Sequence, residues 1–183
     1  MDFDIRQKTA WEDGPDGSKI FYDVWGTQLK VGDKAPDFSL VTDTGSLLTL
    51  NDSPDTSKLI MLVNSVDTPV CKEKTCELDG LLQSKRLPSG AIVYTVSMDL
   101  PFALQRFRQD QRISPAHSLV SASRSGSFGI QYGALMMPDR LLQRAVFVLD
   151  PSNTIRHVEY FQDQGVPPNY ELAHAALRQI AVK

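Results

Sequence analysis

The sequence predicts an α/β domain in which helices flank a central mixed sheet. Three continuous apolar runs, at residues 59–63, 91–96 and 145–149, are short and rich in β-branched or aromatic residues. Runs that do not alternate with polar residues indicate strands buried on both faces. Residues 69–86 read as a helix between the first two runs, so these two strands form a β-α-β unit with parallel pairing.

The remaining elements complete the order. The turn "DPSN" at residues 150–153 predicts a hairpin between 145–149 and 154–160, which adds an antiparallel edge strand. Residues 101–112 and 169–182 have apolar residues at helical spacing. The order β-α-β-α-β-β-α is that of a thioredoxin-like fold, although other α/β sandwiches share it.

The N-terminal part predicts short strands. The alternating residues 18–30 read as a strand or hairpin arm after the turn-rich "EDGPDG", and residues 45–50 read as a short strand. The Ser/Gly-rich residues 121–133 carry no clear element. We therefore expect an N-terminal extension over residues 1–17, an N-terminal β-hairpin, and a single domain over residues 18–183.

Composition excludes several classes of function. A chain of 183 residues with 42% hydrophobic content suits one globular domain. The net charge of −3, without a basic block, favours neither nucleic acid nor an anionic membrane as a partner. The first twenty residues are acidic and hold no continuous apolar stretch, so we expect no signal peptide or membrane helix and a cytoplasmic protein.

The chain has two cysteines, Cys71 and Cys76, and both lie in "DTPVCKEKTC". Close cysteines in a reducing compartment more often indicate chemistry or a metal than a structural disulfide. Zinc is disfavoured because two cysteines are too few ligands and the three histidines are scattered over different predicted elements.

Cys71 lies where a helix start would activate a thiol. Thr68 is predicted as the N-cap and Pro69 as the first helical residue, which places Cys71 at the third position. Free backbone N–H groups and the positive helix end favour a thiolate there. The site also follows a central strand, where α/β sheets tend to bind ligands. The alternative is that Cys71 is a small buried apolar residue.

Cys76 cannot form a disulfide with Cys71 on a continuous helix. A five-residue step rises about 7.5 Å, which puts the two Cα atoms roughly 8 to 9 Å apart, whereas a disulfide requires less than about 7 Å. If the two sulfurs join during function, the first helical turns must unwind. The alternative is that Cys76 packs on the inner face of the helix.

Several ordered motifs resemble the thiol peroxidase branch of the peroxiredoxins: "VGDKAPDFSL", "DTPVC", "TVSMDLPFALQRF", "FGIQYG" and "LLQRAVFVLD", over residues 31 to about 150. The resemblance implies a thioredoxin fold, reduction of hydrogen peroxide or organic hydroperoxides, no metal or organic cofactor, re-reduction by thioredoxin or a similar dithiol protein, and a homodimer. It makes Cys71 the peroxidatic cysteine. It implies that Thr68 hydrogen-bonds the sulfur and the peroxide, and that Arg144 holds the thiolate and polarises the O–O bond.

Two positions depart from that family. Asn64 stands where these enzymes carry a proline seven residues before the peroxidatic cysteine, and Arg108 stands where the thiol peroxidase branch carries its resolving cysteine. Cys76 instead has the spacing of the resolving cysteine in the bacterioferritin-comigratory branch. The hypothesis is that peroxide oxidises Cys71 to a sulfenic acid and that Cys76 captures it as an intramolecular disulfide.

Three functions are therefore open. The first is a thiol-dependent peroxidase that uses Cys71, Thr68, Arg144 and Cys76. The second is a redox sensor or relay, in which the same sulfur reports peroxide to a partner protein. The third is a non-catalytic thioredoxin-fold binding module whose cysteines only pack.

Overall fold

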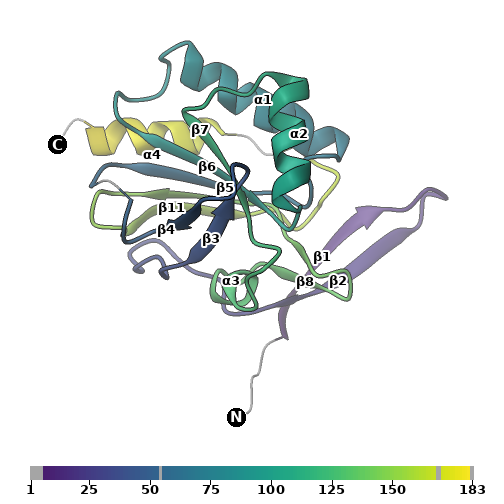
Figure 1. Cartoon of the computed structure of the whole chain (residues 1–183). Helices are drawn as coiled ribbons and strands as arrows, with labels where there is room; N and C mark the ends of the chain where they lie inside the picture. The colour runs from purple at the N-terminus through teal and green to yellow at the C-terminus, as the bar shows by residue number, and fades with distance from the viewer. Residues whose placement is uncertain (1–5, 54, 168–169, 182–183) are drawn as a thin grey trace.

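The computed structural model describes residues 6–53, 55–167 and 170–181, which form two sheets and the helices around them (Figure 1). The larger sheet has seven strands in the order β11 (Ile155–Tyr160), β10 (Ala145–Leu149), β5 (Lys58–Leu62), β6 (Ile92–Ser97), β7 (His117–Ser121), β3 (Ser39–Thr42) and β4 (Leu47–Thr49). The smaller sheet has four, in the order β1 (Arg6–Asp13), β2 (Lys19–Trp25), β8 (Leu135–Met137) and β9 (Leu141–Leu142).

The three apolar runs form the centre of the larger sheet. β5 and β6 pair in parallel, as the β-α-β unit predicts. β10 pairs antiparallel with β5 on one side and with β11 on the other, so the predicted hairpin is confirmed. All five residues of β5 and of β10 are buried, because both faces of the sheet are covered.

Helices cover the two faces unequally (Figure 1). The helices are α1 (Pro69–Gln83), α2 (Pro101–Gln111), α3 (Phe128–Gln131) and α4 (Glu171–Ala181). Residues of α1, α2 and α4 share one apolar cluster with Leu59 and Met61 of β5. The alternate residues Ile60 and Leu62 belong to the cluster on the other face, with α3. The predicted helix at 169–182 is confirmed as α4, although residues 169 and 182 lie outside the described part.

The predicted order was wrong in omitting β7. Residues 117–121 form this strand, which pairs in parallel with β6 and antiparallel with β3. The segment mixes His117 and two serines with only two apolar residues, so it lacks the continuous run of the other central strands. Residue 121 of the Ser/Gly-rich segment ends β7, and the later part of that segment contains α3.

The N-terminal hairpin consists of β1 and β2, which pair antiparallel. The expected boundary between residues 17 and 18 falls in the turn between these strands. The hairpin also contacts the segment after β11: Trp11 N–H donates to Gln162 O at 2.9 Å, and Gln164 N–H donates to Trp11 O at 2.6 Å. Within the described ranges, no helix combines the length and the apolar character that a membrane span requires.

Candidate active site

The segment between β5 and α1 places a helix start at the end of a central strand. Pro69 occupies the first turn of α1 and Thr68 the N-cap, as predicted. The prediction that the Thr68 side chain caps the helix is wrong, because the Thr68 hydroxyl donates to Ser65 O at 3.0 Å instead. Asp99, which follows β6, accepts from Ser65 Oγ and from Val66 N–H, each at 2.8 Å, and so holds this loop.

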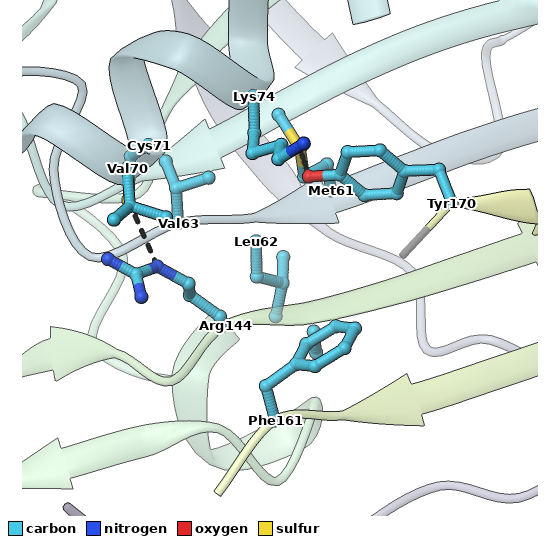
Figure 2. A pocket seen from close by; sticks show the side chains of 10 residues that line it. Met61, Leu62, Val63, Val70, Cys71, Lys74, Arg144, Phe161 and Tyr170 are labelled. Atoms are coloured by element: carbon cyan, nitrogen blue, oxygen red, sulfur yellow. Dashed lines mark hydrogen bonds between the residues drawn. The ribbon is translucent and has the colours of Figure 1, made fainter. Parts of the chain in front are cut away.

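Cys71 lies in the first turn of α1 and points into the protein, where only 1% of the residue is exposed. Arg144, directly before β10, donates from Nε to Cys71 Sγ at 3.2 Å (Figure 2). The guanidinium is itself buried, with 5% of Arg144 exposed. A charged donor at this distance stabilises a thiolate. The structure thus brings together Cys71 and Arg144, which are 73 residues apart in the chain.

A second polar side chain, that of Asn64, also contacts the Cys71 sulfur, but as an acceptor. The Cys71 thiol donates to Asn64 Oδ1 at 3.8 Å, and Asn64 Nδ2 donates to Gln164 Oε1 at 3.2 Å. The same Gln164 oxygen accepts from Arg144 N–H at 3.0 Å. Sequence reasoning missed Gln164, because a single glutamine in a loop carries no motif. Only pairing between distant segments shows that it supports the site.

One nitrogen of Arg144 has no protein partner. Arg144 Nη1 is buried and makes no hydrogen bond to any residue that the structure describes. Buried polar groups are rarely left unpaired, and the exceptions concentrate at functional sites. Because Nε of the same guanidinium binds Cys71 Sγ, the group that contacts the sulfur still has an unused donor in Nη1.

The pocket beside the sulfur is lined by Val70, Lys74, Phe161 and Tyr170, together with Arg144 (Figure 2). The Tyr170 hydroxyl donates to Met61 Sδ at 2.6 Å, and burial raises the pKa of Tyr170, so it stays protonated. Cys71 itself is 1% exposed, so these side chains enclose its sulfur. An oxidant reaches it only if lining side chains move.

Cys76 is half-buried and is a free thiol on the same unbroken helix as Cys71. Burial raises the pKa of the Cys76 thiol; Lys72 acts against this shift and Asp79 adds to it. Cys76 is therefore protonated at neutral pH. The continuous helix also agrees with the expectation that the two sulfurs do not join while α1 is intact.

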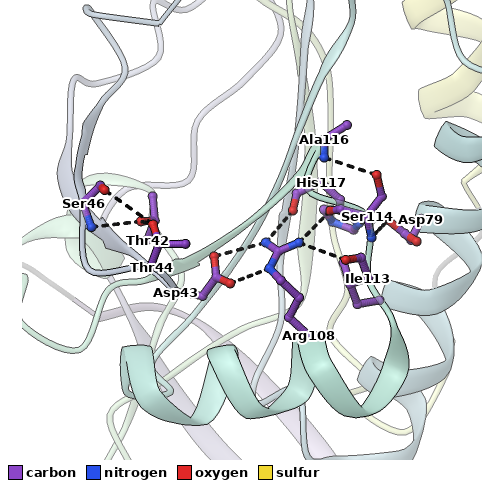
Figure 3. Close-up of polar contacts among 10 residues, drawn as sticks. All are labelled: Thr42, Asp43, Thr44, Ser46, Asp79, Arg108, Ile113, Ser114, Ala116 and His117. Carbon is purple, nitrogen blue, oxygen red and sulfur yellow. Dashed lines mark hydrogen bonds and ion pairs between the residues drawn. The ribbon is translucent and has the colours of Figure 1, made fainter.

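Arg108, at the position where the resembling branch carries its resolving cysteine, joins α2 to the neighbouring segments (Figure 3). Its guanidinium donates to both carboxylate oxygens of Asp43, with Nη2 at 3.1 Å from Oδ1. It also donates to three backbone carbonyl oxygens, those of Ile113, Ser114 and His117. Arg108 thus holds the C-terminal end of α2 against the start of β7.

The histidines are not gathered into a site. His117 is fully buried, with Nε2 at 2.8 Å from Thr95 Oγ1 and Nδ1 at 3.4 Å from Asp79 Oδ1. Burial lowers the pKa of His117, although Asp79 opposes the shift. His157 and His174 lie on β11 and α4. In the part of the chain that the structure describes, no three His, Cys, Asp or Glu side chains meet in a group that could hold a metal ion.

Comparison with known sequences matches the chain to one family and to curated relatives. The model of the AhpC/TSA family matches residues 31–158. The thiol peroxidase of Streptococcus pneumoniae strain R6 is 42% identical over 159 residues, which cover 85% of this chain and 93% of the relative. The thiol peroxidase of Halalkalibacterium halodurans is 39% identical over 153 residues, which cover 84% of this chain and 90% of the relative.

Solved structures share the architecture. A peroxiredoxin-like protein from Aquifex aeolicus superposes with a TM-score of 0.82 at 28% identity, covering 96% of this chain and 99% of that chain. A thiol peroxidase from Chromobacterium violaceum superposes with a TM-score of 0.80 at 23% identity, covering 93% and 96%. The expected thioredoxin-like fold is thereby confirmed. With Cys71 and Arg144 in contact at the start of α1, and with thiol peroxidases as relatives along most of its length, the chain belongs to the AhpC/TSA family of peroxiredoxins.

Proposed function

We propose that this peroxiredoxin acts as a thiol peroxidase in which Cys71 attacks the peroxide and Arg144 stabilises both the sulfur and the reacting oxygens. The contact of 3.2 Å between Arg144 Nε and Cys71 Sγ supports this most directly. The same guanidinium also has a buried nitrogen, Nη1, without a hydrogen-bond partner among the described residues, so it keeps donor capacity for a further acceptor. Without these two features, a cysteine with 1% exposure would be an ordinary buried thiol.

The reaction follows from the charges. The Cys71 thiolate attacks one oxygen of the hydroperoxide, an S–O bond forms and the O–O bond breaks. Negative charge develops on the departing oxygen, which takes a proton from solvent, equivalent to the one that the Cys71 thiol released on ionising, and leaves as water or an alcohol. The positive charge of the Arg144 guanidinium stabilises that negative charge. Because the Thr68 hydroxyl proton is directed to Ser65 O, the lone pairs of Thr68 Oγ1 are left to accept from the O–H of the peroxide.

Cys76 is the proposed resolving cysteine. Its thiolate attacks the sulfur of the Cys71 sulfenic acid, an S–S bond forms, and hydroxide leaves and is protonated to water. The first turns of α1 must unwind for this step, because both cysteines lie on a continuous helix. We propose that thioredoxin or a similar dithiol then reduces the disulfide, and that the protein works as a cytoplasmic homodimer.

One observation favours a second candidate, a peroxide sensor or relay. The sulfur is closed off by its lining side chains, and a closed sulfur suits a protein that reacts seldom and stays oxidised. The third function, a non-catalytic binding module, has no comparable support, since a buried guanidinium bonded to a thiol is not needed for packing.

The experiment measures peroxide-dependent oxidation of a thioredoxin system by the wild type, Cys71→Ser and Cys76→Ser. We expect no activity from Cys71→Ser. Cys76→Ser is expected to keep the first oxidation of Cys71 but to lose thioredoxin turnover or require another thiol. Mass mapping after one equivalent of peroxide distinguishes a cycle that Cys76 resolves from a one-cysteine cycle. Free Cys76 beside oxidised Cys71 would contradict the resolving role. A wild type that oxidises stoichiometrically but turns over slowly would favour the sensor.

A further inference from the structure

Asn64 lies beside the reacting sulfur in place of the proline of the resembling family, and a proline side chain has no hydrogen-bonding group. Asn64 is 5% exposed and follows β5. Its Oδ1 is the acceptor for the Cys71 thiol at 3.8 Å. The sulfur therefore has both a donor, Arg144 Nε at 3.2 Å, and an acceptor, Asn64 Oδ1 at 3.8 Å. The donor favours the thiolate, whereas the acceptor favours the thiol.

Backbone groups fix the orientation of the Gln164 side-chain amide, and Gln164 in turn fixes that of Asn64. Gln164 Nε2 donates to two backbone carbonyl oxygens, those of Phe161 and Gln162, and a carbonyl can only accept. Gln164 Oε1 accepts from Arg144 N–H at 3.0 Å, and a backbone N–H can only donate. The Gln164 side chain therefore cannot be reversed in this network.

This fixed glutamine in turn determines how Asn64 faces the sulfur. Because Gln164 presents its oxygen to Asn64 at 3.2 Å, Asn64 must present its NH2 group to Gln164. The Asn64 oxygen is then left to face Cys71. Gln164 is 1% exposed, and its backbone N–H donates to Trp11 O of β1 at 2.6 Å. The N-terminal hairpin thus supports the residue that orients Asn64.

We propose that Asn64 is a positioning residue for the peroxidatic sulfur: its side-chain oxygen, oriented by Gln164, holds Cys71 as a thiol and opposes the ionising effect of Arg144. The inference rests on the proposed function, in which Cys71 is the nucleophile. Proline at this position would leave Arg144 unopposed.

Among the described residues, the charged and titratable groups that line the pocket with Cys71 are Arg144 before β10, Lys74 on α1 and Tyr170 before α4. None of them changes in the experiment. The assay measures the rate at which iodoacetamide alkylates Cys71 as a function of pH. All variants also carry Cys76→Ser, so that Cys71 is the one thiol that can react. The variants are Asn64→Leu, which removes the acceptor at similar size, and Asn64→Asp, which places a carboxylate there.

The two substitutions are expected to shift the profile in opposite directions. Asn64→Leu moves the half-maximal rate to lower pH and speeds alkylation on the acidic side of the profile by at most about fivefold, because a thiol is a weak donor and an ordinary hydrogen bond sets the upper bound. Asn64→Asp moves it to higher pH, because a like charge opposes the thiolate. A merely structural role would disturb the site in the same way with either residue.

Gln143→Met is the matched control. Gln143 is also a fully buried amide that donates to Phe161 O, at 2.9 Å, but its oxygen pairs with Gln28. Its profile is expected to match the parent. Equal or same-sign shifts in Asn64→Leu and Asn64→Asp overturn the inference, as does a Gln143→Met shift of the same size. If Asn64→Leu does not fold, Asn64→Ala carries the same prediction.

The experiment distinguishes failure of the peroxidase assignment from failure of the role proposed for Asn64. If the parent protein alkylates normally but hydrogen peroxide does not oxidise Cys71, the peroxidase assignment fails while the opposite shifts can still be scored. If peroxide oxidises Cys71 and the shifts are absent, only the role of Asn64 fails.

Discussion

Replacing Arg108 by Met should destabilise the protein strongly, because it removes every bond that this guanidinium makes between α2 and its neighbours. The pair with Asp43 is largely buried, with 18% of the Arg108 side chain and 4% of the Asp43 side chain exposed. Breaking a buried pair typically costs about 3–5 kcal/mol, since the remaining charge stays buried without a partner. The exposure of Arg108 favours the lower end of that range, about 3 kcal/mol.

Arg106→Met is a control on the same helix. Arg106 pairs with Asp67 at 3.3 Å, but 62% and 63% of the two side chains are exposed. Exposed pairs contribute about 1 kcal/mol or less to the free energy of unfolding. The two variants therefore remove the same residue type from α2 and differ in burial.

The assay is urea unfolding followed by tryptophan fluorescence and by circular dichroism. We expect Arg108→Met to lower the free energy of unfolding by about 3 kcal/mol, and Arg106→Met by under about 1 kcal/mol. Adding Asp43→Asn to Arg108→Met should restore part of the loss, because it removes the unpaired carboxylate. Similar losses in Arg108→Met and Arg106→Met would refute the view that Arg108 clamps α2.

Three further predictions concern chemistry and pH. Arg144→Met should slow peroxide oxidation of Cys71 by roughly tenfold or more, because a charge-assisted hydrogen bond is lost. Stopped-flow fluorescence measures this rate, and an unchanged rate would exclude the proposed role of Arg144. Disulfide formation after one equivalent of peroxide should accelerate about tenfold per pH unit between about pH 7 and 8, since Cys76 attacks as the thiolate and burial raises its pKa. A rate that does not change with pH would contradict attack by the Cys76 thiolate. Stability should fall as pH drops below 6.5, because burial lowers the pKa of His117 from 6.5 and the unfolded chain then binds the proton more readily. Urea midpoints at about pH 7.5 and 5.5 should differ less in His117→Gln than in the wild type, and an equal difference would assign the effect to other groups.

The local parts of this protein could be read from its residues. The apolar runs predicted the central strands β5, β6 and β10, and "DTPVC" predicted a helix start with Cys71 in its first turn. Such features depend on neighbours within a few residues, so periodicity and turn chemistry are enough to find them. The motifs also identified Arg144 through the family resemblance, whereas an arginine beside a strand would otherwise suggest a solvated charge.

The tertiary structure decided which distant groups meet at the sulfur and how closely they are enclosed. Asn64 and Gln164 are 100 residues apart in the chain, and they meet because β10 pairs with β5 on one side and with β11 on the other. Such pairing leaves no local pattern, since it depends on the register of strands from separate parts of the chain. The burial of Cys71 likewise depends on Phe161 and Tyr170, which pack over it only after the sheet and α4 have assembled.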